Sequence, residues 1–187
     1  MKFLKYSFVL FCLVLMVFVS SCKEDEQQPL TQMEILMSHP WISSDFDVRI
    51  ITGITSLNYD VLNEIEACRT DDQISFYSET RFRALEGSNE CTGAPSDGII
   101  FDSTWNLNEG TETLSLDAGY VEQIVAGDNS LPISLADLAT DGFLVMDVRE
   151  LNTERVRLYL EKPVQITISG FSVPGTVIME VTLIPVN

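Results

Sequence analysis

After residue 40, much of the chain has an apolar residue at every second position and a polar residue between each pair of apolar ones. In residues 46–50, for example, Phe46, Val48 and Ile50 are separated by charged residues. A period of two is that of a β-strand with one face in water and one face in a core. The pattern predicts ten strands, at residues 46–50, 73–77, 81–84, 104–108, 114–116, 120–125, 143–148, 155–161, 164–169 and 176–184.

Two other segments have helical spacing. Residues 30–38 are predicted to form a short helix, because Thr31 and Glu34 match a capping box and His39-Pro40 ends the pattern. A further helical turn or two is predicted within residues 59–67. Helices are therefore expected to be a minor part of the fold.

The strands are expected to form one antiparallel, all-β domain over residues 30–187. Connections are short, and the glycines of Asn108-Glu109-Gly110 and Asp117-Ala118-Gly119 stand where tight hairpin turns need a positive φ. An antiparallel sheet of this size protects its edges by closing into a barrel or by doubling into a sandwich. Both produce the same alternation, so both remain open on this pattern alone.

The first 21 residues differ from the rest of the chain. A short start with Lys2 and Lys5 precedes an apolar stretch, Phe8 to Val19, and two small residues. This order is typical of a secretory signal peptide. The apolar stretch is shorter than the roughly 20 residues that a membrane-spanning helix needs, and no later stretch approaches that length. We therefore expect residues 1–21 to be removed and the mature chain to have no spanning helix.

The ending Val19-Ser20-Ser21-Cys22 resembles the lipobox of bacterial lipoproteins, which implies cleavage before Cys22 and lipid attachment to its thiol. The alternative is a free Cys22 after cleavage by the general signal peptidase. Residues 22–29 are polar and acidic and are expected to be a solvated tether. The run Cys22–Glu26 resembles the export signal of surface lipoproteins in Bacteroidota-type bacteria. It implies a lipid-anchored protein of the outer membrane, exposed on the cell surface, with a periplasm-facing position as the alternative.

The expected mature chain is strongly acidic. Removing residues 1–21 leaves nine Lys and Arg against 28 Asp and Glu, a formal charge of −19. Such a surface repels phosphate backbones, so we do not expect a nucleic-acid partner.

Cysteine usage predicts one disulfide. Cys12 leaves with the signal and Cys22 takes the lipid, so Cys68 and Cys91 remain in a compartment that permits oxidation. A bridge between them would contribute about 3 kcal/mol in the chain-entropy model. The alternative is a pair of independent thiols.

Three features over residues 30–118 resemble lipocalin-like lipoproteins of Bacteroidota. They are a helix followed by Pro40-Trp41, the run Cys68-Arg-Thr-Asp-Asp-Gln-Ile-Ser-Phe76 with Gly87-Ser-Asn-Glu-Cys91, and the later Trp105-Asn-Leu107. The resemblance implies an up-and-down barrel of about eight to ten strands with a short N-terminal helix, an interior cavity and a Cys68–Cys91 disulfide. The C-terminal part matches only in hairpin rhythm and carries an apparent extra strand pair, 164–169 and 176–184.

Candidate catalytic residues are few. His39 is the only histidine and stands at the predicted helix end, so a nucleophile–base pair would have to use it. Asp71-Asp72 is the most noticeable carboxylate pair, although adjacent strand residues point to opposite faces and turn roles are expected. The hypothesis of an envelope hydrolase is supported only by the abundance of such carboxylates. We therefore expect a protein that is not an enzyme.

No metal or cofactor is expected either. Ser96, Asp97, Gly98 and Asp102 could supply oxygen ligands for calcium, but they lack the ordered spacing of a calcium loop.

Two functions follow as hypotheses. Aromatic residues could line a cavity for a small hydrophobic ligand or could simply fill the core: Phe46, Phe76, Phe82, Trp105, Tyr120 and Phe143. The leading hypothesis is a membrane-anchored, non-enzymatic lipoprotein that binds such a ligand in its barrel. The alternative is an accessory lipoprotein that binds an envelope protein or a glycan through loops such as Asn89–Gly98 and Gly127–Pro132.

Overall fold

The computed structural model describes residues 29–53, 55–124, 133, 135–168 and 171–186. Thr31–Asn187 forms one compact unit, separate from Met1–Leu30. The predicted signal segment, Cys22 and residues 22–28 of the predicted tether lie outside the described residues, as does the loop Gly127–Pro132. None of the helices in the described ranges is long and apolar enough to cross a membrane.

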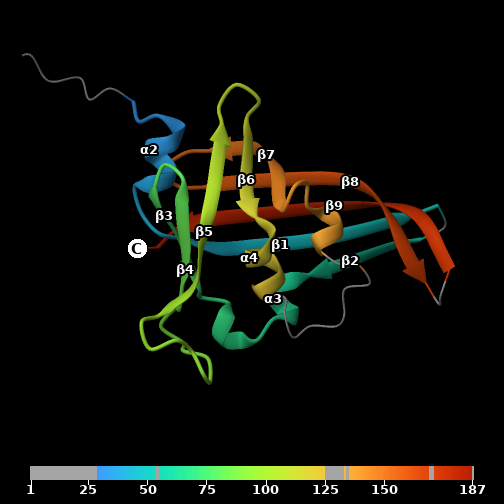
Figure 1. Cartoon of the computed structure of the whole chain (residues 1–187), viewed down its shortest axis with the longest axis horizontal. Helices are drawn as coiled ribbons and strands as arrows, with labels where there is room; N and C mark the ends of the chain where they lie inside the picture. Colours follow the sequence, from blue (N-terminus) through green and yellow to red (C-terminus); the bar gives the residue numbers. More distant parts are fainter. Residues whose placement is uncertain (1–28, 54, 125–132, 134, 169–170, 187) are drawn as a thin grey trace, which may run out of the picture. The chain divides into compact units, whose positions relative to one another are not determined.

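The described strands form one antiparallel sheet (Figure 1). Its order is β2-β1-β3-β4-β5-β6-β7-β8-β9, and a further pairing of β1 with β9 closes it. Eight strands therefore make a closed up-and-down barrel, and β2 is an addition to β1. The bounds are β1 Trp41–Thr52, β2 Ser56–Asp60, β3 Gln73–Ser78, β4 Arg81–Leu85, β5 Ile99–Asn108, β6 Thr113–Asp117, β7 Phe143–Leu151, β8 Val156–Ile168 and β9 Phe171–Pro185.

This closure decides between barrel and sandwich. The barrel is the lipocalin-like architecture that the sequence resemblance implied, and the strand count lies within the predicted range. Closing the sheet leaves the ring itself without edges, which is the advantage of a barrel over an open sheet.

Strand β1 both closes the barrel and extends beyond it. One side pairs with β9 along its length, from Trp41–Pro185 to Thr52–Gly175. The other side is shared, because Trp41 and Ile42 pair with β3 whereas residues 47–51 pair with β2. The far part of β1 therefore belongs to the extension that it forms with β2, β8 and β9.

The short helices agree in part with the sequence analysis. Helix α2, Gln32–Met37, has the predicted capping box: the Thr31 hydroxyl accepts a hydrogen bond from the Glu34 amide at 3.2 Å, and the Glu34 carboxylate accepts one from the Thr31 amide at 2.8 Å. The segment 59–67 contains only α3, Val61–Glu64, followed by the 3₁₀ helix η1, Ala67–Arg69. Strand β2, directly before α3, was not predicted.

The predicted strand 120–125 is wrong. The structure has helix α4 there, Ala118–Ile124, followed after a gap by the 3₁₀ helix η2, Leu135–Leu138. Tyr120 and Val121 are adjacent and both buried, which suits a helix and not an alternating strand. The carboxylate of Asp117 accepts a hydrogen bond from the Gly119 amide at 2.9 Å, as an N-cap side chain does.

The predicted glycine turns are also corrected. Gly119 lies inside α4 instead of a hairpin turn. In the β5–β6 connection the positive φ belongs to Glu112, at 51°, and not to Gly110. The turn itself forms where it was predicted, because the Thr111 amide donates to the Asn108 carbonyl at 3.3 Å, but the positive φ follows that turn at Glu112.

The predicted strands 155–161 and 164–169 belong to a single strand, β8, and the predicted pairing of 164–169 with 176–184 is wrong. Residues 164–168 pair with 171–175 in the outer part of one long β8–β9 hairpin, whereas residues 176–184 pair with the earlier part of β8 and with β1. Pro163 pairs with Thr176 of β9, and Pro174 pairs with Gln165 of β8. Pairing of β7 with β8 reaches only Tyr159, and pairing of β1 with β9 ends at Gly175. Both prolines therefore lie where the strand has one neighbour, the position at which a missing N–H is tolerated.

Candidate functional site

The barrel interior is filled with side chains. All buried residues in the described ranges are hydrophobic. A small apolar cavity of about 30 Å³ lies between the strands, lined among others by Phe46, Met146 and Met179. Binding sites for small molecules usually measure about 300–1,000 Å³. Five of the six aromatic residues singled out in the sequence are buried core residues, and the sixth, Phe143, is half-buried outside the core. The described conformation has no room in this cavity for a ligand.

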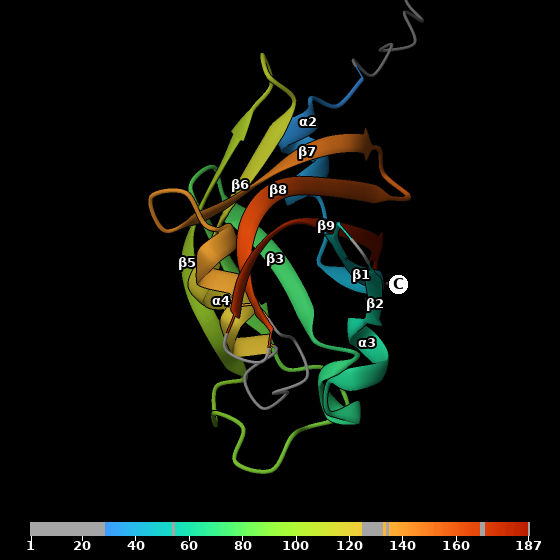
Figure 2. The ribbon, with the colours of Figure 1, turned by 90° about the vertical axis from the view of Figure 1, so that its right-hand side faces the viewer.

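Helix α4 contributes to this filling. Tyr120 is 4% exposed, and its ring meets the ring of Phe82 edge-on at 5.4 Å and lies 5.9 Å from that of Phe101. Tyr120 and Val121 line the small cavity together with strand residues. Figure 2 shows α4 close to the surrounding strands. Burial, and secondarily the charge of Asp72, raises the pKa of Tyr120 above its ordinary value.

The segment before β3 is joined to the loop after β4 by the disulfide Cys68–Cys91, with Cα atoms 5.2 Å apart. The Asp71 carboxylate accepts hydrogen bonds from the Ser88 hydroxyl at 2.8 Å and the Asn89 amide at 3.0 Å. Asp72 accepts one from the Gly87 amide at 3.2 Å. Each aspartate has its own partners in the loop, so the pair fastens the loop and does not form an acid–base dyad.

Asp72 has an unusual environment. Partial burial raises its pKa from 3.8 to about 6, against the opposing effect of the Gly87 amide, and the nearby Glu86 adds to the rise. The folded protein therefore retains the Asp72 proton to a higher pH than the unfolded chain does. The stability that this provides is full below about pH 4 and is lost as the pH rises through about 6.

We expect Asp72→Asn to stabilise the protein at pH 7.5, by roughly 1–2 kcal/mol after allowance for solvent screening, and to have almost no effect at pH 4. Asparagine still offers an oxygen to the Gly87 amide but no longer a charge. Urea unfolding at the two pH values measures the difference.

The matched control is Asp71→Asn. Burial alone would raise the pKa of Asp71, but hydrogen bonds from Ser88 and Asn89 outweigh it and lower the pKa. This variant should therefore lose stability at pH 7.5. A gain of equal size in both variants would show that reduced net charge, and not the site of Asp72, is responsible.

His39 does not complete a catalytic triad. It follows α2, its ring centroid lies 4.2 Å from that of Trp41, and its Nδ1 is 2.7 Å from the Ser38 hydroxyl. That hydroxyl donates to the Ile35 carbonyl at 2.7 Å, so its proton is engaged. No carboxylate holds the His39 ring within the described part of the chain, and burial lowers the pKa of His39. The arrangement is that of a helix-end residue, as expected.

The two carboxylates of the possible calcium ligand set, Asp97 and Asp102, are engaged with other partners. Asp97 accepts a hydrogen bond from the Ile99 amide at 3.1 Å, as in a local turn. Asp102 is on the outer face of β5 and pairs with two arginines. Glu66 lies close to Cys68 and Cys91, but the disulfide already occupies both sulfurs.

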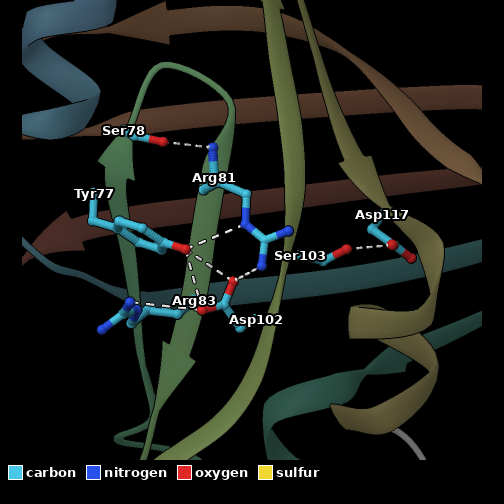
Figure 3. Close-up of polar contacts among 7 residues, drawn as sticks. All are labelled: Tyr77, Ser78, Arg81, Arg83, Asp102, Ser103 and Asp117. Atoms are coloured by element: carbon cyan, nitrogen blue, oxygen red, sulfur yellow. Dashed lines mark hydrogen bonds and ion pairs between the residues drawn. The ribbon is translucent and has the colours of Figure 1, made fainter.

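A cluster of polar side chains surrounds Asp102 on the barrel wall (Figure 3). The Tyr77 hydroxyl lies 3.0 and 3.1 Å from the two Asp102 oxygens and accepts a hydrogen bond from Arg81 at 3.2 Å. Arg81 also pairs with Asp102, and Arg83 lies 4.0 Å above the Tyr77 ring centroid. The cluster links β3, β4 and β5. Its charged groups, Arg81, Arg83 and Asp102, have a net charge of +1 and interact mainly with one another.

Larger hollows lie on the outer face of the barrel. One of about 590 Å³ is lined by β7 and β8, including Arg149, Tyr159 and Lys162. Arg149 lies 4.6 Å from the Tyr159 ring centroid, and Lys162 donates to the Leu138 carbonyl at 2.9 Å. A neighbouring hollow of about 310 Å³ shares Arg149 and Tyr159. The space available to a partner in this conformation is therefore mainly outside the barrel.

No family model and no curated protein matches the chain. Among solved structures, the chain is similar to a lipocalin-like protein from Bacteroides uniformis ATCC 8492. The two are 12% identical, the match covers 81% of this chain and 99% of the other, and the TM-score is 0.34.

Proposed function

We propose that the protein is a lipid-anchored, non-enzymatic lipoprotein of the outer membrane that binds an envelope protein or a glycan through its outer surface. The observation that carries this proposal is the filled barrel: the apolar interior cavity measures about 30 Å³, whereas a hollow of about 590 Å³ lies outside. A barrel with a packed core is a rigid support for surface recognition.

Anchoring rests on the lipobox and the acidic tether. Replacing the acceptor, Cys22→Ala, should move the protein from the membrane fraction to the soluble fraction, because the acyl chains supply the membrane affinity. Cys12→Ala, which alters a cysteine of the signal segment, is the control and should leave the protein in the membrane. Protease treatment of intact cells then separates a surface position from a periplasm-facing one. Membrane retention of Cys22→Ala would contradict the anchor.

A second candidate function is the binding of a small hydrophobic ligand inside the closed barrel. The observation that favours it is that part of the filling comes from Tyr120 and Val121 on α4, and not from the barrel strands themselves. If α4 moved outward, it would vacate apolar space. A ligand of this kind would then compete with these side chains.

Native mass spectrometry of the full protein, isolated from its own envelope in mild detergent, tests the two candidates. We expect a complex with a protein or glycan partner and no retained small molecule. A stoichiometric small molecule on the isolated chain, with no partner, would contradict the proposal in favour of ligand binding.

A further inference from the structure

The larger outer hollow lies where β8 separates from β7. Among the described residues, the pairing of the two strands ends at Asp147–Tyr159, whereas β8 continues to Ile168. The hollow of about 590 Å³ is lined by Val145 of β7 and by residues 159–163 of β8, which places it at this separation. Binding sites for small molecules usually measure about 300–1,000 Å³, so the hollow has room for such a ligand.

Lys162 fixes one wall of this hollow. Its ammonium group donates hydrogen bonds to the carbonyls of Leu138 and Ala139 at 2.9 and 2.8 Å, and to the Thr140 hydroxyl at 3.3 Å. These contacts join the end of η2 to β8, and both Leu138 and Thr140 line the hollow. The hollow is therefore shaped by tertiary contacts that the fold holds in place.

A second hollow, of about 310 Å³, continues the first and shares Arg149 and Tyr159 with it. The strand register explains this continuity, because Tyr159 pairs with Asp147 on one side and with Glu180 on the other. These three side chains form one row across β7, β8 and β9 on the outer face, whereas the adjacent Leu158 is buried. We call the two hollows together the outer groove.

The outer groove is locally balanced in charge on a strongly acidic chain. The larger hollow is lined by two acidic residues, Asp147 and Glu161, and by two basic ones, Arg149 and Lys162. The smaller hollow likewise has two acidic and two basic residues. The chain as a whole has a net charge of −17, which repels anions. The groove therefore suits an uncharged ligand better than an anionic one.

Its side chains offer both hydrogen-bond donors and acceptors. Asp147 accepts a hydrogen bond from Arg149 at 3.2 Å, and Glu161 accepts one from the Tyr159 hydroxyl at 2.6 Å. A carboxylate can accept about four hydrogen bonds and an arginine can donate five, so these contacts leave capacity for a ligand. The Arg149 side chain is 55% exposed. Hydroxyl groups, which both donate and accept, match such a lining.

Tyr159 adds an apolar surface in the middle of the groove. Its ring lies between the two hollows, and the Arg149 guanidinium is 4.6 Å from the ring centroid. Tyrosine combines a flat apolar ring with a polar tip. The C–H face of a sugar ring is complementary to such a ring, and its hydroxyls are complementary to the charged residues around it.

The edge of β8 in the groove is protected against an added protein strand. Glu161, Lys162 and Pro163 follow one another there, and charged residues and proline are what proteins use to prevent strand addition. Charged residues are also depleted from the cores of protein interfaces. Both features favour a glycan over a protein in this groove.

We propose that the outer groove binds an uncharged oligosaccharide. Asp147 and Glu161 accept hydrogen bonds from its hydroxyls, and Arg149 donates to them. One sugar ring packs on Tyr159. This inference rests on the proposed function and specifies its partner as a glycan and its surface as the outer groove.

A photoreactive benzoylphenylalanine in place of Val145, in the full-length protein within its own envelope, tests the proposal. Val145 lines the larger hollow and is 41% exposed. The control position is Tyr77, which is also 41% exposed but lies on β3, outside the groove. After digestion, mass spectrometry should find neutral sugars attached to the peptide that contains position 145 and none on the peptide that contains position 77.

Variants that carry the same probe at position 145 locate the binding residues. The yield of the sugar adduct should fall at least about tenfold in Tyr159→Ala and should also fall in Arg149→Ala, with unchanged melting temperatures. Tyr77→Ala is the matched control, because the Tyr77 ring also lies beneath an arginine, with Arg83 at 4.0 Å. This variant should leave the yield unchanged.

The other outcomes overturn the inference in different ways. A peptide adduct from position 145 would assign the groove to a protein, and an acidic sugar would exclude the uncharged ligand class. A sugar adduct that persists in Tyr159→Ala and Arg149→Ala, or no adduct at position 145, would remove the groove as the glycan site. All four results leave the proposed function standing. A small molecule retained inside the isolated chain, with no sugar adduct and no partner, would overturn both.

Discussion

Replacing Trp105 with alanine is expected to lower the free energy of unfolding by about 3–5 kcal/mol, the usual loss for a large buried aromatic residue. Trp105 is 2% exposed, and its Nε1–H donates to the Ser78 carbonyl at 2.8 Å. Its ring meets the Phe76 ring edge-on at 4.7 Å. The substitution therefore removes packing and leaves a carbonyl at the β3–β4 turn without its donor. Urea unfolding measures the loss.

Two further variants show whether the loss comes from this position. Trp105→Phe keeps an aromatic ring but not the donor, and should lose clearly less than Trp105→Ala. Tyr77→Ala removes a ring that is 41% exposed on β3, together with its surface contacts to Asp102, Arg81 and Arg83, and should lose less again because those contacts are solvated. Since whole domains are stable by about 5–15 kcal/mol, the alanine variant should unfold at much lower denaturant concentration. Equal losses in Trp105→Ala and Tyr77→Ala would contradict the packed interior.

Removing the disulfide, by Cys68→Ser with Cys91→Ser, is expected to cost about 3 kcal/mol, because the bridge restricts a loop with a sequence separation of 23 residues in the unfolded chain. Dithiothreitol should shift the unfolding midpoint of the wild-type protein to that of the double variant. The same reductant should leave the double variant unchanged, which is the control. An unshifted wild-type midpoint under complete reduction would contradict a stabilising bridge.

Most of the strands could be predicted because a half-buried strand imposes a period of two on its residues. Phe46, Val48 and Ile50 face the core exactly as their alternation indicates, and the charged residues between them are exposed. The division of β8 into two predicted strands falls around Pro163, because proline usually ends a strand. Its tolerance depends on whether a neighbouring strand needs the missing N–H, which only the barrel register reveals.

Helix α4 was missed for a related reason. Tyr120 and Val121 favour strands in isolation, but here tertiary packing places both in the core on one helical turn. The signal that could have found the helix is Asp117, which acts at its start as an N-cap residue does. Strand β2 was missed because Leu57 and Tyr59 make too short an alternation to stand out from a loop.

For the candidate sites, sequence reasoning reached the pairing of Cys68 with Cys91, since few alternatives remained once the other cysteines had roles. It could not separate a ligand cavity from a packed core, because both place apolar side chains on the inner face.

Electron density for the barrel interior would show whether side chains or a bound molecule fill it. The crystal should contain the protein released from its own membrane in detergent, so that any native ligand is retained. We expect density for the Tyr120 ring against Phe82 and for Val121 beside it, with no further continuous density between the strands. Continuous density for a bound molecule, with Tyr120 displaced from Phe82, would contradict a barrel filled by its own side chains.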